Sequence, residues 1–152
     1  MSFDFPEDVQ GGMFYALKQS WASDSVKHAF LICDAPAHGK DVNQGHIDNF
    51  PNGHPEGYII QDLTKEFADK NINFTMVKVN KDCDQMIGVL QAVYKKSGKT
   101  LNVTDLADAV KNLSQAEITK KFVEGMSFML STTLGSGKTA SGSVGRPVKR
   151  TT

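Results

Sequence analysis

The 152-residue chain lacks several features that define whole classes of protein. It has two cysteines, Cys33 and Cys83, which are too few for the disulfide framework of a small secreted domain. No apolar run approaches the roughly 20 residues that a membrane-spanning helix requires, and the acidic N-terminus carries no signal-peptide pattern. We therefore expect a soluble protein of the cytoplasm.

An excess of charge is also absent, because 17 Lys and Arg residues balance 17 Asp and Glu residues. The distribution is uneven, since residues 135–152 contain basic residues, no acid, and many Gly, Ser and Thr. This composition predicts a disordered basic tail. The remainder, residues 1–134, is slightly acidic and has the length of one domain, so we expect no nucleic-acid-binding surface on it.

Hydrophobic patterning predicts that helices and strands alternate along the chain. Four successive apolar residues, 30–32 with Cys33, predict a strand over 27–33 that is buried on both faces. The other expected elements are helices at 9–21, 58–71 and 82–98, strands at 72–79 and 100–103, and helices after Thr104 and over 114–134. This order predicts an α/β fold with about three parallel strands joined by right-handed crossovers.

Asp34 directly follows the strand at 27–33 and begins a loop rich in Pro and Gly that continues to residue 55. Long loops in compact domains are usually functional, and ligands of open parallel sheets bind beyond the carboxyl ends of the strands. A carboxylate at this point can hold a hard cation, orient a hydroxyl group or cap its own turn. The residues alone leave these three roles open.

Two further patterns predict no site. The stretch Gly135-Ser136-Gly137-Lys138-Thr139 lacks the first glycine and the preceding strand of a phosphate-binding loop, so it is expected to be a linker. His38, His46 and His54 recur at a spacing of eight residues, which matches no ordinary zinc site.

Three stretches resemble, in their order and spacing, the later half of a von Willebrand factor type A (VWA) domain. They are D-F-P-E-D at 4–8, C-D-A-P-A-H-G at 33–39 and P-N-G-H-P-E-G at 51–57. The pattern is most similar to the VWA version found beside alpha-type protein kinases in protists. The resemblance extends from residue 3 to about residue 132. It implies a partial doubly wound, Rossmann-like fold whose first strands are missing.

The resemblance also implies a metal site, because VWA domains hold a magnesium ion above the sheet. It implies Asp34 as one ligand, and Glu7 with Asp8 as the segment that supplies further oxygens. Magnesium takes hard oxygen ligands and keeps several waters, so an acidic side chain of a protein partner would complete its shell. The D-x-S-x-S motif that completes the site in this family does not occur in the chain, and the implied site is therefore incomplete.

Taken together, the resemblance implies a non-enzymatic interaction module, namely a truncated regulatory region of an alpha-kinase without the kinase domain. The missing strands would come from another chain that assembles with this one. An alternative from a different class is a small α/β hydrolase or nucleotide-using enzyme, in which Asp34 would orient His38 as a general base.

Overall fold

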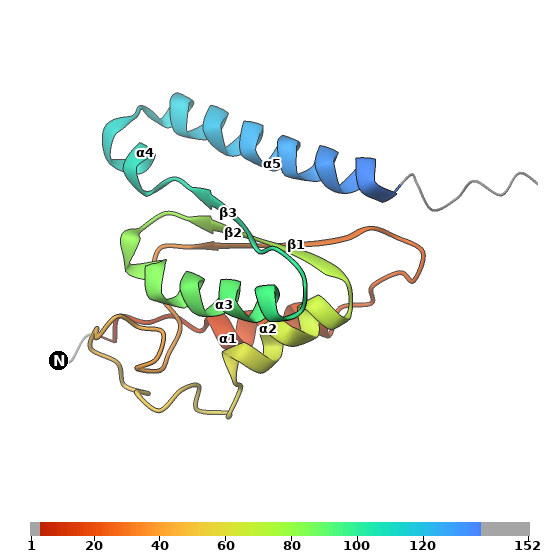
Figure 1. The fold of residues 1–152 in the computed structure, drawn as a ribbon. Coiled ribbons are helices and arrows are strands. Elements are labelled where there is room, and N and C mark those ends of the chain that lie inside the picture. The colour runs from red at the N-terminus through yellow and green to blue at the C-terminus, as the bar shows by residue number, and fades with distance from the viewer. Residues whose placement is uncertain (1–3, 138–152) are drawn as a thin grey trace, which may run out of the picture.

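The computed structural model describes residues 4–137 and contains a three-stranded parallel sheet with helices on both of its faces (Figure 1). The strands are β1 (Lys27–Cys33), β2 (Ile72–Lys78) and β3 (Asn102–Asp105), and they lie side by side in this order. The helices are α1 (Val9–Leu17), α2 (Ile60–Asp69), α3 (Asp84–Lys96), α4 (Ala107–Asn112) and α5 (Gln115–Gly137), and a short 3-10 turn, η1 (Lys81–Cys83), precedes α3. The predicted α/β fold with three parallel strands is confirmed.

The sheet separates two layers of helices. Helices α1, α2 and α3 cover one face, and the long helix α5 runs across the other (Figure 1). Phe74 and Met76 of β2 belong to the apolar cluster under α2 and α3, whereas Thr75 between them contacts the sulfur of Met129 in α5. This alternation is the two-residue period of a strand, and it buries β2 on both faces.

Strand β1 has the predicted range but not the predicted burial. Phe30 is 38% exposed and Ile32 is 57% exposed, so the prediction that this strand is buried on both faces is wrong. The physical reason is its position, because β1 pairs with β2 on one side and with no other strand among residues 4–137. The strand that is buried on both faces is the central β2.

Helix α1 is shorter than the sequence predicted. It begins at Val9, with the Asp8 side chain accepting a hydrogen bond from the Gly11 N–H at 2.8 Å, and it ends at Leu17. A Cβ at Gly11 would lie 2.3 Å from a carboxylate oxygen of Asp8, so only glycine leaves room for this cap. At the other end, the Trp21 indole donates to the carbonyl of Ala16 at 3.0 Å and closes the helix.

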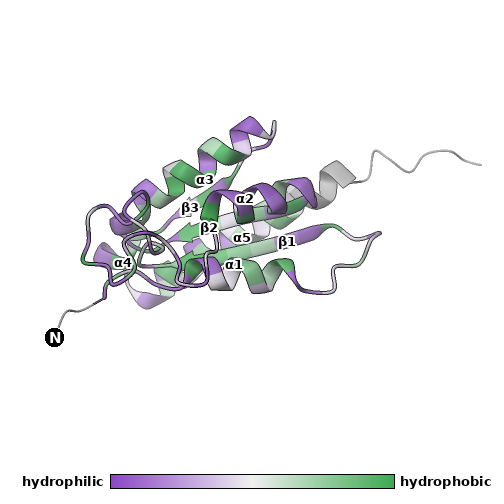
Figure 2. Ribbon diagram, turned by 90° about the horizontal axis from the view of Figure 1, so that it is seen from below, coloured by the Kyte–Doolittle hydropathy of each residue, from purple (hydrophilic) through white to green (hydrophobic). Residues whose placement is uncertain are grey.

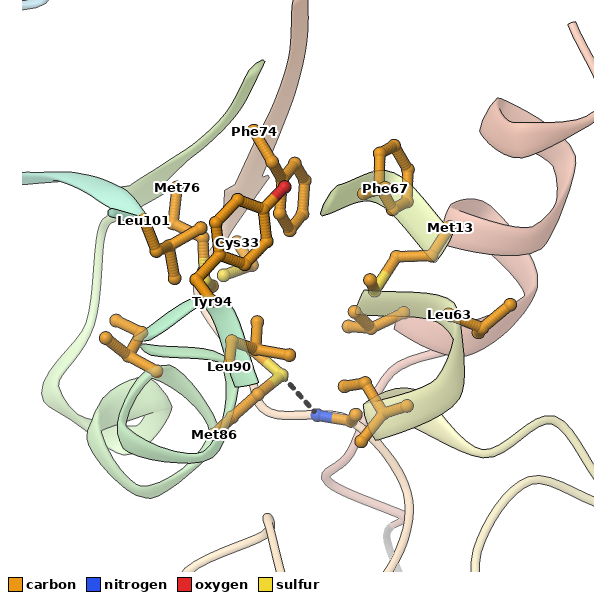
Figure 3. Packing of buried hydrophobic residues seen from close by; sticks show 14 of the residues in the cluster. Met13, Cys33, Leu63, Phe67, Phe74, Met76, Met86, Leu90, Tyr94 and Leu101 are labelled. Carbon is orange, nitrogen blue, oxygen red and sulfur yellow. Dashed lines mark hydrogen bonds between the residues drawn. The ribbon is translucent and has the colours of Figure 1, made fainter. Parts of the chain in front are cut away.

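The hydrophobic core fills the space between the sheet and helices α1–α3 (Figure 3). Phe67 of α2 stacks on Phe74 of β2 with ring centroids 4.8 Å apart, and the hydroxyl of Tyr94 donates to the carbonyl of Ile72. Seen from the side of α1–α3, the outward surface of α2 is mostly hydrophilic, while β1, which runs beside it in this view, is mostly hydrophobic (Figure 2). The amphipathic helices therefore bury their apolar sides against this face of the sheet.

Helix α5 continues to Gly137, three residues beyond the predicted domain boundary at residue 134. The remainder of the predicted disordered tail, 138–152, lies outside the described residues, as do Lys138 and Thr139 of the expected linker. Within residues 4–137, no helix combines the length and the apolar character needed to cross a bilayer.

Candidate functional site

The loops beyond the carboxyl end of β1 bring together two segments in which the sequence predicted ligands. Asp34 follows β1 directly and is exposed. The backbone of Glu7 pairs with that of Ala37, and the Glu7 N–H donates to the carbonyl of Pro36 at 2.9 Å, so the two segments run side by side. Among the described residues, none forms a hydrogen bond or ion pair with the carboxylate of Glu7 or Asp34, and both groups are free to bind a ligand.

The third predicted ligand, Asp8, has other partners. Its Oδ1 accepts the N–H of Gly11 at 2.8 Å and lies 2.8 Å from Nε2 of His54, whose side chain is nearly buried. These contacts cap α1 and fasten the loop after β1 to the start of that helix. Asp8 is therefore a capping residue, and Oδ1 of its carboxylate is already engaged.

Two of the predicted ligands, Glu7 and Asp34, have side chains of the kind that binds magnesium. Glu7 and Asp34 supply the hard oxygens that this ion prefers, and one or two carboxylates with several waters are a common magnesium shell. Among the described residues, the possible ligand atoms of Asp34, Glu7 and Asp8 do not all lie within 4.8 Å of one another. Within the described part of the chain, the group that meets this distance is Asp4, His38 and Asp48. The magnesium site at Asp34 stays a prediction.

Asp48 is the most heavily hydrogen-bonded side chain of the loop. Its Oδ1 accepts from Nδ1 of His38 at 2.9 Å and from the N–H of Phe50 at 2.7 Å. Its Oδ2 accepts from the N–H of Gly39 at 2.8 Å and from the amide of Asn43 at 2.9 Å. The side chain is 1% exposed, so these four donors replace water around a buried charge.

These contacts also set the protonation state of Asp48. Burial by itself raises the pKa of a carboxyl group, but the hydrogen bonds from Gly39, His38, Phe50 and Asn43 outweigh it and hold the pKa of Asp48 below its ordinary value. Asp48 is thus a carboxylate at neutral pH, and Nδ1 of His38 is the donor in their hydrogen bond. Both acceptor oxygens are saturated, which leaves no lone pair for a cation in the cluster with Asp4.

The His38–Asp48 pair corrects the alternative interpretation in which Asp34 orients His38, because Nδ1 of His38 is held by Asp48 instead. Asp48 was not among the predicted site residues. An aspartate whose carboxylate accepts the N–H two residues ahead, here that of Phe50, is nevertheless a recognisable turn signal. An imidazole held at Nδ1 presents Nε2 as a proton acceptor. Among the described residues no hydroxyl or thiol side chain hydrogen-bonds to His38, so the pair has the geometry of a structural clamp.

The two other loop histidines are also paired with aspartates, each on a different part of the chain. The three pairs are His38–Asp48 at 2.9 Å, His46–Asp82 at 3.2 Å and His54–Asp8 at 2.8 Å. They tie the loop to itself, to η1 and to the start of α1.

A hollow of about 320 Å³ lies between α1, the loop and the start of α2, and its lining includes Gln10, His38 and His54. The Gln10 amide donates to the carbonyl of His38 at 2.7 Å, while its buried Oε1 has no partner among the described residues. This oxygen is an acceptor for a water molecule or a ligand donor.

Two free thiols lie just below Asp34. Cys33 ends β1 and Cys83 ends η1, both are buried, and their Sγ atoms are 3.6 Å apart. The neighbouring Cys33 and burial both raise the pKa of Cys83, so this thiol is protonated at neutral pH.

Comparison with known proteins relates part of this chain to part of one larger protein. No protein-family profile matches the chain, and no solved structure matches it. Over 112 residues the chain is 32% identical to the alpha-protein kinase vwkA of Dictyostelium discoideum, an alignment that covers 71% of this chain and 18% of that protein. The chain thus spans less than a fifth of the length of this relative, and it is homologous to one region of an alpha-protein kinase.

Proposed function

We propose that this chain is a VWA-like protein-interaction module that accompanies an alpha-type protein kinase, as part of its regulatory region, and performs no catalysis itself. The similarity to one region of vwkA supports the connection to such kinases. The three sequence stretches that resemble VWA domains support the type of module. Its two cysteines are free, as suits the reducing cytoplasm.

The observation that carries the proposal is the open edge of β1. Its outer backbone groups have no partner strand within residues 4–137, and Phe30 and Ile32 expose apolar surface on the same strand. Parallel sheets are normally covered on both faces, and an unpaired apolar edge is a ready template for another strand. A protein partner that lays a strand along β1 would satisfy the backbone groups, and the side chains on one face of that strand would pack against Phe30 and Ile32.

The same partner would reach the predicted cation site. Asp34 follows the last residue of β1, so a strand paired with β1 ends beside it. A magnesium ion held by Asp34 and Glu7 keeps coordination positions for water, and an acidic side chain of the partner would replace one of these waters. Partner binding would then depend on both the strand edge and the cation.

A charged residue introduced on the open edge of β1 tests whether the partner binds along this edge. Ile32→Lys is expected to weaken binding of the partner by about tenfold or more, because an unpaired ammonium would be buried in the interface. The measurement is quantitative mass spectrometry of proteins retained by the immobilised wild-type chain and its variants, with magnesium or with a chelator.

Ile47→Lys is the matched control, since Ile47 is 63% exposed against 57% for Ile32 and belongs to the loop and not to β1. The proposal requires a protein that the wild type and Ile47→Lys retain and that Ile32→Lys and the chelator both release. Equal retention by both lysine variants would contradict the role of the β1 edge.

Magnesium binding at Asp34 can be tested without a partner. If magnesium binds the folded chain with a dissociation constant of about 1 mM, adding about 10 mM magnesium adds about 1.4 kcal/mol to the free energy of unfolding. The expected result is a rise of a few degrees in the melting temperature, read by circular dichroism. Asp34→Asn should abolish the rise, and Asp24→Asn, an exposed loop substitution, should keep it. An unchanged rise in Asp34→Asn would remove Asp34 from the site.

A further inference from the structure

Cys33 and Cys83 form a pair of thiols that the proposed partner binding does not use. They are fifty residues apart in the chain, and their Sγ atoms lie 3.6 Å apart. Both sulfurs are free thiols, and both residues belong to the buried apolar cluster. Their contact joins the end of β1 to the turn before α3.

The fold holds the two thiols in place. The N–H of Val79 donates to the carbonyl of Cys33 at 3.0 Å, which extends the pairing of β1 and β2 past the last strand residue. The chain then turns at Asn80, whose side chain caps η1, and Cys83 comes back over the end of β1. The Cys83 thiol lies 3.8 Å from the carbonyl of Cys33 as well. Ordered backbone on both sides therefore keeps the sulfurs in contact.

We infer that Cys33 and Cys83 are a redox modification site, which forms a reversible intramolecular disulfide when the protein meets a peroxide. A disulfide needs its sulfurs at about 2.05 Å, so the two atoms must approach by about 1.5 Å. Rotation about the Cα–Cβ bonds of the two cysteines, with a small shift of η1, supplies a movement of this size.

The reaction with hydrogen peroxide is balanced. Cys33 is the more accessible thiol, with 8% exposure against 0% for Cys83. Its sulfur attacks one peroxide oxygen, the O–O bond breaks, and a sulfenic acid and one water form. The sulfur of Cys83 then attacks the sulfur of Cys33, and the hydroxyl leaves as a second water with the thiol proton. Two thiols and one peroxide become one disulfide and two waters.

The disulfide would staple β1 to the start of α3 and close a loop that contains the segment after β1, α2 and β2. Such a cross-link restricts the unfolded chain, so the melting temperature of the oxidised protein should rise by about 5–10 °C. The inference does not rest on the proposed partner, because the cross-link forms within one chain whether or not β1 is covered.

The test treats the native wild-type protein with hydrogen peroxide and alkylates the remaining thiols after denaturation. The expected product has no alkylated cysteine, has lost the mass of two hydrogen atoms, and yields one cross-linked Cys33–Cys83 peptide. Dithiothreitol should restore both thiols and the original melting temperature. Cys33→Ala and Cys83→Ala are the controls, and neither should show the rise in melting temperature after oxidation.

The inference is overturned if the wild type keeps two alkylatable thiols at peroxide concentrations that oxidise a small free thiol. It is overturned equally by disulfides only between chains, or by sulfinic and sulfonic acids without a cross-link. The wild-type mass and peptide map decide the question even where an alanine variant fails to fold.

Discussion

Replacing Asp48 by asparagine is expected to lower the free energy of unfolding by about 3 kcal/mol, since each buried donor left without an acceptor costs about 1–3 kcal/mol. The asparagine amide keeps one acceptor oxygen, but its NH₂ group meets two of the four donors that now reach the carboxylate. The loop from Gly39 to Phe50 would lose the group around which it folds. Urea unfolding monitored by circular dichroism measures the change.

The same variant changes the dependence of stability on pH. Because the folded-state pKa of Asp48 is below the unfolded value of about 3.9, its contribution is fully present above that value and is lost as the pH falls through the folded-state pKa. The wild type should therefore lose more stability than Asp48→Asn between about pH 5 and pH 2. Asp105, whose pKa is also lowered because Lys78 outweighs the effect of burial, leaves a residual slope in both proteins.

Asp24→Asn is the control, because Asp24 is exposed and surface substitutions usually change stability by less than about 0.5 kcal/mol. If Asp48→Asn unfolds at the same urea concentration as this control and has the wild-type pH profile, the clamp around Asp48 does not stabilise the fold.

The second large effect is expected at Met86, whose sulfur is joined to a nitrogen by a dashed line in the core (Figure 3). Met86 is completely buried, and its sulfur accepts the N–H of Ala37 at 3.3 Å. Met86→Ala should lower the free energy of unfolding by about 4 kcal/mol, because the cavity costs about 2–5 kcal/mol and a buried N–H loses its partner. Chemical denaturation with two independent probes measures the loss and checks that unfolding is cooperative.

Met86→Leu separates the two contributions. Leucine conserves most of the volume but has no acceptor, so packing alone predicts a loss under about 1.5 kcal/mol, and the orphaned N–H of Ala37 adds about 1 kcal/mol or more. A leucine variant as stable as the wild type would show that the sulfur contact contributes nothing. Amide hydrogen exchange at Ala37 reports on the same hydrogen bond directly, and it should accelerate in both variants.

The limits of a strand were predicted well where neighbouring residues in the sequence set them, and less well where pairing with another strand sets them. The range 27–33 was correct because its apolar run is bounded by Asp34 and Pro36, and β2 differs from the predicted 72–79 by one residue. Strand β3 was predicted at 100–103 and lies at Asn102–Asp105. Three of its four residues are half-buried and the last is exposed, so its limits are set by pairing with β2. The exposure of β1 was not predictable from its composition, because burial depends on neighbours.

The resemblance predicted which two segments lie together, but not the contacts between distant loop residues that decide the rest of the local geometry. The segments of Glu7 and Asp34 do lie side by side, joined through the backbone of Ala37. The partners of Asp8 and Asp48 were missed because each is a histidine from an irregular loop, and no periodic pattern relates their positions.

The open edge of β1 also bears on the colloidal behaviour of the isolated protein. A strand edge that accepts a partner accepts another copy of itself, and the formal net charge of zero provides no mutual repulsion between molecules. Precipitation is therefore favoured near the isoelectric point of about 6.9 and opposed well away from it. Purification and storage at moderately alkaline pH, where each molecule carries negative charge, would keep the sheet edges apart.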